Sequence, residues 1–268
     1  MKLNRILTFI AIATLGFVAL AQPNASLSIN DEQRQQTISV TVISDDIVRV
    51  DVVPDVWKGE RLPSLALEQS LNEGKAKVTR NNYGNDADVI TTSTGLRVVL
   101  DKHLKSVQVS CGNNYFTTDL CDRTLHGSLR LLHNGKESFY GAGERGYSFN
   151  LCGDTLINYN KQNYGYVSGE KRIKQMGITM PFIISSKGYG IFFDDFCKSS
   201  LRIGEEGIEY NSISPQPISY YVIDGHGKVE NVVKEFTWLV GRQELPHCGH
   251  WDISLQNMDT TISVRARE

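Results

Sequence analysis

Apolar and polar residues alternate along two neighbouring segments, and this two-residue period is the strongest constraint on the fold. The apolar residues of Thr37–Val42 share one face, and in Ile47–Val53 three valines lie opposite Arg49 and Asp51. Such a period places every second side chain on the same side of an extended strand. We therefore expect two β-strands, and the turn residues Ser44-Asp45-Asp46 between them predict a hairpin.

Similar patterns predict more strands and a single helix. The further strands are expected at Val89–Thr92, Leu96–Leu100, Lys105–Ser110, Gly127–Leu132, Met180–Ser185, Tyr189–Phe193 and Ser219–Ile223. The polar segment Asn72–Asp88 is expected to be a loop. Apolar residues recur at helical spacing between Val229 and Leu239, and Gly241 follows as a C-terminal stop. Many strands with one late helix favour an all-β sandwich over an α/β fold.

The N-terminal segment 1–21 is typical of a secretory signal. Lys2 and Arg5 precede an apolar run from Ile6 to Leu20, and the run ends in an Ala-Leu-Ala cleavage pattern. That run is shorter than the about 20 residues that a membrane-spanning helix needs. We therefore expect an exported protein, periplasmic or secreted, with no membrane attachment after cleavage.

Charge and cysteine content point away from several other classes. The formal net charge is −2, so we expect no nucleic-acid partner. The cysteines, which lack His or Cys partners at ligand spacing, are Cys111, Cys121, Cys152, Cys197 and Cys248. We assign no metal and no cofactor. Cys111 and Cys121 could close a short disulfide loop, but buried free thiols are an equally good interpretation.

The segment Phe139–Tyr166 is unusually rich in glycine and aromatic residues. Tyrosines and amides of this kind occur in sugar-binding loops, where ring faces cover C–H surfaces and amides bond hydroxyls. A long loop folded onto a β core has the same composition, so composition alone leaves both interpretations open.

Four motifs in this order resemble the N-terminal β-sandwich of glycoside hydrolase family 31, which includes α-glucosidases and α-xylosidases. The motifs are Gly141-Ala142-Gly143-Glu144-Arg145, the Tyr159–Tyr166 segment, Met180-Pro181-Phe182 followed by Gly190–Asp195, and Gly241–Pro246. The resemblance is good over residues 139–246 and loose before them. It implies a galactose-mutarotase-like β-supersandwich over residues 22–244, placed before a (β/α)₈ barrel.

In that family the barrel holds two catalytic aspartates, which retaining hydrolysis requires about 5–5.5 Å apart. The resemblance therefore implies no catalytic residue in the sandwich itself. It implies that the loop Asp154–Tyr166 reaches the mouth of the barrel, with Asn160, Gln162 and Tyr164 as substrate-binding residues. Gln162 stands where many members have an aspartate, so it keeps hydrogen-bonding capacity but lacks the charge.

Residues 247–268 do not resemble the first barrel strand of the family. When the codons from His247 to Ile253 are read from the last base of the His247 codon, they specify leucines and a glycine where the family has them. We therefore hypothesise a single-base deletion, which makes residues 247–268 an out-of-frame, disordered tail and removes the barrel. A divergent but genuine C-terminus is the alternative.

Three functions remain to be weighed. The first is an accessory domain of an exported α-glycosidase, inactive alone, with an oligosaccharide or α-glycoside and its own catalytic barrel as partners. The second is a stand-alone carbohydrate-binding sandwich that uses Tyr147, Tyr159, Tyr164 and Tyr166. The third is an aldose epimerase, which needs a His and a Glu in one cleft, and the histidines 103, 126, 133 and 226 lie in no motif for it.

Two structural expectations accompany these functions. Glu144 and the pair Asp194-Asp195 are expected to have structural roles rather than catalytic ones. Loss of the barrel is expected to expose an apolar face around Phe236, Trp238 and Leu239 and to promote self-association.

Overall fold

A computed structural model represents the protein. It describes residues 26–59, 63–68, 76–112, 114–119, 128–133, 136–145, 148–160, 178–205, 207–213, 217–242, 253–257 and 260–264.

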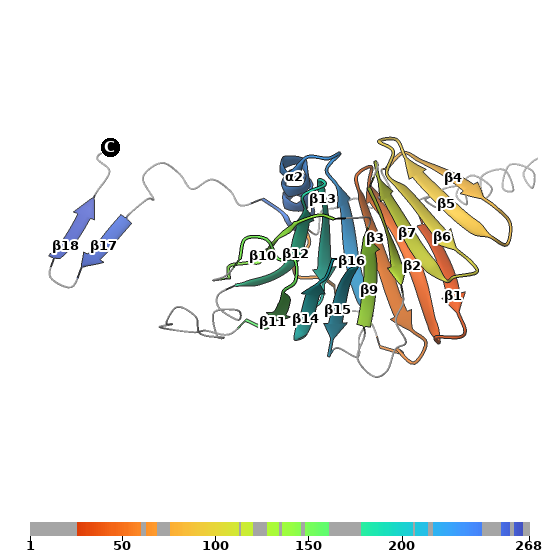
Figure 1. Ribbon diagram of the computed structural model, residues 1–268, viewed down its shortest axis with the longest axis horizontal. Helices are drawn as coiled ribbons and strands as arrows, with labels where there is room; N and C mark the ends of the chain where they lie inside the picture. Colours follow the sequence, from red (N-terminus) through yellow and green to blue (C-terminus); the bar gives the residue numbers. More distant parts are fainter. Residues whose placement is uncertain are drawn as a thin grey trace, which may run out of the picture.

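Two antiparallel sheets face each other and form a sandwich (Figure 1). The seven-stranded sheet has the order β1 (Ser26–Asp31), β2 (Gln36–Ser44), β3 (Ile47–Pro54), β16 (Ile218–Asp224), β13 (Tyr189–Asp194), β12 (Thr179–Ser185) and β10 (Phe139–Gly143). The nine-stranded sheet has the order β11 (Thr155–Asn158), β14 (Ser199–Ile203), β15 (Gly207–Ser212), β9 (Ser128–His133), β8 (Asn114–Asp119), β7 (Ser106–Cys111), β6 (Arg97–Asp101), β5 (Ala87–Thr92) and β4 (Val78–Asn82).

The main core lies between these sheets and follows the alternation seen in the sequence. Ile38, Val40 and Val42 of β2 pair with the valines of β3 and are fully buried in one cluster that also holds residues of the opposite sheet. Each such side chain contributes roughly 1.5–3 kcal/mol on burial. The predicted β2–β3 hairpin and the predicted all-β sandwich are confirmed.

Helix α2 (Val229–Val240) covers the outer face of the seven-stranded sheet and creates a second core. Val232, Phe236 and Leu239 are buried against it, and the Phe236 ring stacks on Phe182 with centroids 3.7 Å apart. The helix approaches closely because Gly190 of β13 lacks a side chain: a Cβ there would lie 2.6 Å from Val232 Cγ1. Strands β13 and β16 are therefore buried on both faces.

The predicted helix and its glycine stop are confirmed, since α2 ends at Val240 and Gly241 has φ 87°. The expected exposure of Phe236 and Leu239 is wrong. Both residues pack on the sandwich itself, whereas Trp238 points away and keeps 38% of its surface exposed. The periodicity identified an apolar face correctly, but the partner of that face is the protein's own sheet.

Several strands were not predicted. The segment expected to be a polar loop contains β4, whose side chains are mostly exposed because it is the edge of its sheet. The glycine-rich stretch contains β10 and β11 rather than being loop throughout. Cys111 is a buried free thiol on β7, and burial raises its pKa; Cys121 lies outside the described residues.

Where a disordered tail was expected, the strands β17 (Ile253–Asn257) and β18 (Thr260–Val264) pair with each other. They form a separate two-stranded sheet, drawn away from the sandwich in Figure 1. The frameshift explanation for residues 247–268 stays a hypothesis.

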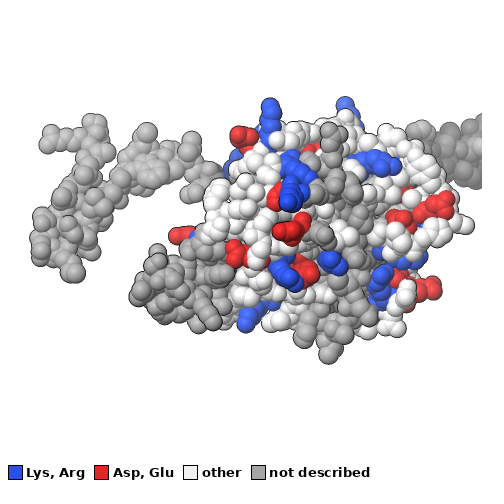
Figure 2. Space-filling model, in the orientation of Figure 1, with Lys and Arg blue, Asp and Glu red and all other residues white. Residues whose placement is uncertain are grey.

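Charges of both signs are interspersed over the visible face of the sandwich (Figure 2), as the net charge of −2 leads one to expect. In the part of the chain that the structure describes, no helix has the length and apolar character needed to cross a membrane.

Candidate functional site

The Gly-Ala-Gly motif forms an irregular bend at the end of β10. Gly141, Ala142 and Gly143 all have positive φ, at 101°, 64° and 89°. The pairing register with β12 shifts between the two glycines. A Cβ on Gly141 would lie 2.7 Å from the Phe182 carbonyl oxygen, and one on Gly143 would overlap the Ile178 carbonyl oxygen. Glycine is needed at both positions because the neighbouring backbone leaves no room for a side chain.

This bend directs Arg145 into a hydrogen-bonded connection between the two sheets. Its Nε donates to the Ala142 carbonyl at 2.8 Å and its Nη1 to the Ile157 carbonyl at 3.0 Å. Its Nη2 donates to Asn158 Oδ1 at 2.8 Å, and Asn158 Nδ2 donates to Ser199 Oγ at 3.1 Å. The guanidinium group therefore links edge strand β10 of one sheet to β11 and β14 of the other. We call Arg145 and Asn158 the edge clamp.

Immediately beyond the edge clamp, Asn160 is hydrogen-bonded to Thr179. Its Oδ1 accepts hydrogen bonds from the Thr179 amide at 2.7 Å and from Thr179 Oγ1 at 2.8 Å. Asn160, which was predicted to bind substrate, lies in the described part of the chain, and its side-chain oxygen bonds Thr179. Its role in substrate binding stays a prediction. The other two predicted residues, Gln162 and Tyr164, lie outside the described residues.

Of the tyrosines proposed as a sugar platform, Tyr159 alone lies in the described part of the chain. It keeps 53% of its surface exposed, and the Lys198 ammonium lies 5.5 Å from its ring centroid. Tyr147, Tyr164 and Tyr166 fall outside the described residues. The structure therefore places a partly exposed aromatic ring at the root of the loop.

The aspartates of the third motif bond within the sandwich. Asp194 accepts a hydrogen bond from Ser64 Oγ at 2.7 Å. Asp195 accepts one from the Cys197 amide at 2.9 Å and one from the Tyr210 hydroxyl at 2.8 Å. Burial raises the pKa of Tyr210. These contacts agree with the structural role expected for both aspartates. Glu144 is exposed, and its backbone amide donates to the Ile178 carbonyl at 2.8 Å.

The fold brings together a His–Glu pair that no sequence motif indicated. His133 Nδ1 lies 3.1 Å from Glu137 Oε1, and His133 Nε2 lies 3.2 Å from the Gly204 carbonyl. Because a carbonyl only accepts, Nε2 carries a hydrogen. Ser185 Oγ donates to Glu137 Oε2.

The surroundings of Glu137 favour its ionised form. Burial alone would raise the pKa of Glu137, but its interactions with His133, Ser185 and Tyr189 outweigh burial and hold the pKa below its usual value. The Lys187 ammonium also lies 3.9 Å from Glu137 Oε1. Both side chains are only 1% exposed. A sugar cannot reach them, so the pair gives no support to the epimerase interpretation.

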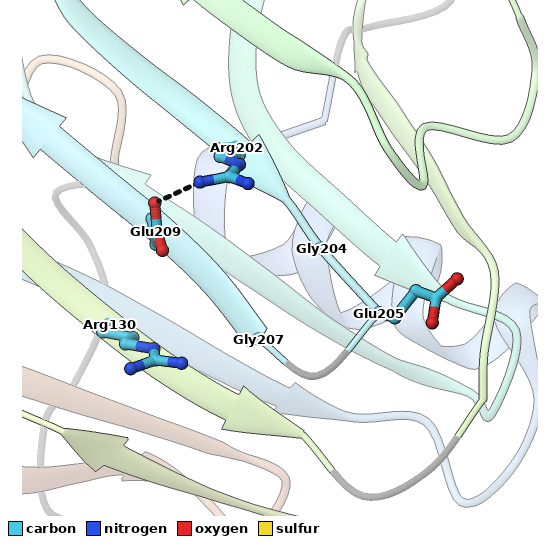
Figure 3. A pocket seen from close by; sticks show the side chains of 6 residues that line it. All are labelled: Arg130, Arg202, Gly204, Glu205, Gly207 and Glu209. Atoms are coloured by element: carbon cyan, nitrogen blue, oxygen red, sulfur yellow. Dashed lines mark hydrogen bonds and ion pairs between the residues drawn. The ribbon is translucent and has the colours of Figure 1, made fainter.

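A small charged hollow opens on the outer face of the nine-stranded sheet (Figure 3). Its volume is about 240 Å³, and its lining residues are Arg130, Arg202, Gly204, Glu205, Gly207 and Glu209. Figure 3 shows Arg202 and Glu209 pointing toward each other, with Nη1 and Oε2 3.4 Å apart. Both are well exposed, so this pair contributes little stability.

Metal-binding chemistry finds no support in the described residues, where no group of three or more His, Cys, Asp and Glu side chains could hold an ion.

Comparison with known proteins gives α-xylosidases among the relatives. The chain is 34% identical over 127 residues to the α-xylosidase XylQ of Lactiplantibacillus pentosus and 32% identical over 127 residues to an α-xylosidase of Emericella nidulans. Each alignment covers 47% of this chain. The aligned part spans 16% and 15% of the lengths of those relatives.

Solved structures share the fold. A dextranase of glycoside hydrolase family 31 from Flavobacterium johnsoniae, complexed with glucose, superimposes with a TM-score of 0.61 at 19% identity, over 79% of this chain and 26% of that one. A family 31 α-xylosidase from a soil metagenome, complexed with xylose, gives a TM-score of 0.59 at 12% identity, over 81% of this chain and 34% of that one.

The sequence profile described as the Glycosyl hydrolase 31 N-terminal galactose mutarotase-like domain matches residues 37–201. This range begins well before residue 139, where the motif-based resemblance became good. It covers strands of both sheets, the Gly-Ala-Gly bend and the edge clamp. The chain belongs to the N-terminal galactose mutarotase-like domain family of glycoside hydrolase 31.

Proposed function

We propose that this chain is the accessory N-terminal domain of an exported α-glycosidase and that it completes the substrate pocket of a catalytic barrel. The observation that carries the proposal is the profile match over residues 37–201, which runs through both sheets of the sandwich. Export rests on the signal-like segment 1–21. The substrate class is an oligosaccharide with α-glycosidic bonds, and the α-xylosidases among the relatives favour α-xylosides.

The role that we propose for this domain is to support a substrate-binding loop rather than to catalyse the reaction. Retaining hydrolysis needs two carboxyl groups about 5–5.5 Å apart and open to substrate. Glu137, Asp194 and Asp195 instead bond to groups of the sandwich. The edge clamp and the Asn160–Thr179 contact fix both ends of the segment 161–177. Our proposal retains Asn160, Gln162 and Tyr164 as the residues that reach the sugar.

Two experiments test this function. We expect the purified chain to release no 4-nitrophenol from 4-nitrophenyl α-D-xyloside or α-D-glucoside above the rate in buffer. Turnover at an ordinary enzymatic rate would show that the chain is an enzyme by itself. Sequencing of the gene tests the frameshift hypothesis, because the shifted frame after the Pro246 codon should encode a long catalytic barrel. An early stop codon in that frame would refute the hypothesis.

A further inference from the structure

A second hollow lies on the outer face of the nine-stranded sheet. Ser128, Asn211, Ser200 and Ile157 lie directly opposite one another on β9, β15, β14 and β11. Their strand neighbours point into the core, so this cross-strand row faces outward. The hollow has a volume of about 490 Å³, within the range of roughly 300–1,000 Å³ typical of small-ligand sites. We call it the row groove.

The lining of the row groove also includes residues at the start of β14 and the end of β15. These residues are Lys198, Ser199, Ser212 and Ile213. The Ile213 amide donates to the Lys198 carbonyl at 3.2 Å, which joins these strand ends. The hollow therefore extends from the cross-strand row to this pair of strand ends.

The lining combines hydrogen-bonding groups with apolar walls. Serine hydroxyls and the Asn211 amide can each donate and accept hydrogen bonds. Ile213 is 59% exposed although it lies among polar residues, and Ile157 lines the other side. A sugar ring presents hydroxyls at its edge and C–H groups on its face, so this lining matches both parts.

The neighbouring charges favour an uncharged ligand. The next outward row of the same strands carries Arg130, Glu209 and Arg202, and Glu205 lies on the adjoining turn (Figure 3). The two signs balance, and Arg202 pairs with Glu209. Lys198 lies over the Tyr159 ring. The cross-strand row itself is uncharged, and Lys198 is the one charged residue among those that line the described groove, so no cluster of cations is present to select an anionic sugar.

We propose that the row groove binds a neutral oligosaccharide, as a surface site that continues from the loop root at Tyr159 and Asn160. Lys198 supplies the continuity because it lines the groove and also contacts Tyr159. Asn158 adds a second link, since it bonds both Arg145 of the edge clamp and Ser199 of the groove. The inference rests on the proposed function, which supplies the substrate class.

The test is an NMR titration of the ¹⁵N-labelled chain with isomaltotriose, a neutral α-linked trisaccharide. We expect saturable shifts of the Ser128, Ser200 and Asn211 amides, with an affinity in the range of about 1 mM, which is typical of a shallow sugar site. Ser200→Tyr fills the groove from a half-buried, outward-facing strand position, where tyrosine is well accepted. This variant should weaken binding at least about tenfold, and Asn211→Ala should weaken it about fivefold.

Arg202→Gln is the matched control, because it lies on the same strand one row away and should leave the affinity unchanged. Trigalacturonic acid serves as the anionic probe and should cause no saturable shifts in the row groove. Absence of shifts at the three amides, or equal affinity in Ser200→Tyr, would overturn the proposal. Shifts confined to residues around Asn160 would overturn sugar binding in the row groove but would agree with the proposed accessory function. The hydrolysis assay and the gene sequence test that function separately.

Discussion

Two of the polar connections between the sheets of this sandwich differ in exposure and in charge. The edge clamp uses the half-buried Arg145 against two backbone carbonyls and one amide oxygen, all uncharged acceptors. The His133–Glu137 pair sets an imidazole against a carboxyl group, with both side chains 1% exposed, and Glu137 reaches Ser185 of the opposite sheet. The clamp lies beside the loop root, so it can serve the site. The pair lies in the interior, where it can serve only the fold.

The largest expected effect comes from breaking the interior pair. Glu137→Ala removes a buried carboxylate that accepts from Ser185 and lies beside His133 Nδ1 and the Lys187 ammonium. Leaving buried polar groups without a partner costs about 1–3 kcal/mol each, so we expect a loss of about 3 kcal/mol or more. Urea denaturation followed by fluorescence measures the loss. Glu205→Ala removes an exposed acid and should change stability by less than about 0.5 kcal/mol. A loss at Glu137 no larger than this control would show that the pair does not stabilise the fold.

A smaller effect is expected at the edge clamp. Arg145→Ala removes three hydrogen bonds from a charged donor, but Arg145 is only half-buried and its acceptors are uncharged, so no buried charge is left behind. We expect a loss of about 2–3 kcal/mol in urea denaturation. Arg145→Lys should recover only part of it, because an ammonium lacks the planar fork that meets three acceptors at once. Full recovery by lysine would mean that charge, and not geometry, holds the clamp.

The two connections should also differ in how they affect the pH dependence of folding stability. Because the folded state lowers the pKa of Glu137, its contribution is present above the unfolded pKa of about 4.3 and is lost as pH falls through the folded value. Stability measured between about pH 6 and about pH 3 should therefore fall less steeply in Glu137→Gln than in the wild type. Arg145→Ala should retain the wild-type slope, since the clamp has no titrating acceptor. Equal slopes in all three proteins would remove this distinction.

The smallest expected effect is at the loop root. Asn160→Ala removes the two hydrogen bonds to Thr179 at a cost of about 1 kcal/mol, because the site is exposed and water replaces them. Hydrogen exchange of the Thr179 amide should increase, while that of the Ile184 amide in the same strand should not. Unchanged exchange at Thr179 would show that Asn160 does not hold the loop ends.

Local patterns predicted the elements whose environment is regular. Alternation identified β2 and β3, and helical spacing identified α2, because each pattern reflects a single apolar face. Strand β4 was missed because an edge strand with exposed side chains has no such face. The burial of β13 on both sides was not foreseen, because it depends on a helix that follows about 35 residues later in the chain.

The sequence by itself determined the β class, helix α2 and the family, because periodicity and ordered motifs can be recognised before any contact is known. It also predicted Asn160 as a substrate-binding residue, which stays a prediction. Only the tertiary structure decided that Arg145 reaches Asn158, that His133 meets Glu137 and that a neutral row crosses β9, β15, β14 and β11. The physical reason is that a strand pattern depends on neighbouring residues, whereas these contacts depend on which strands pair and in which register.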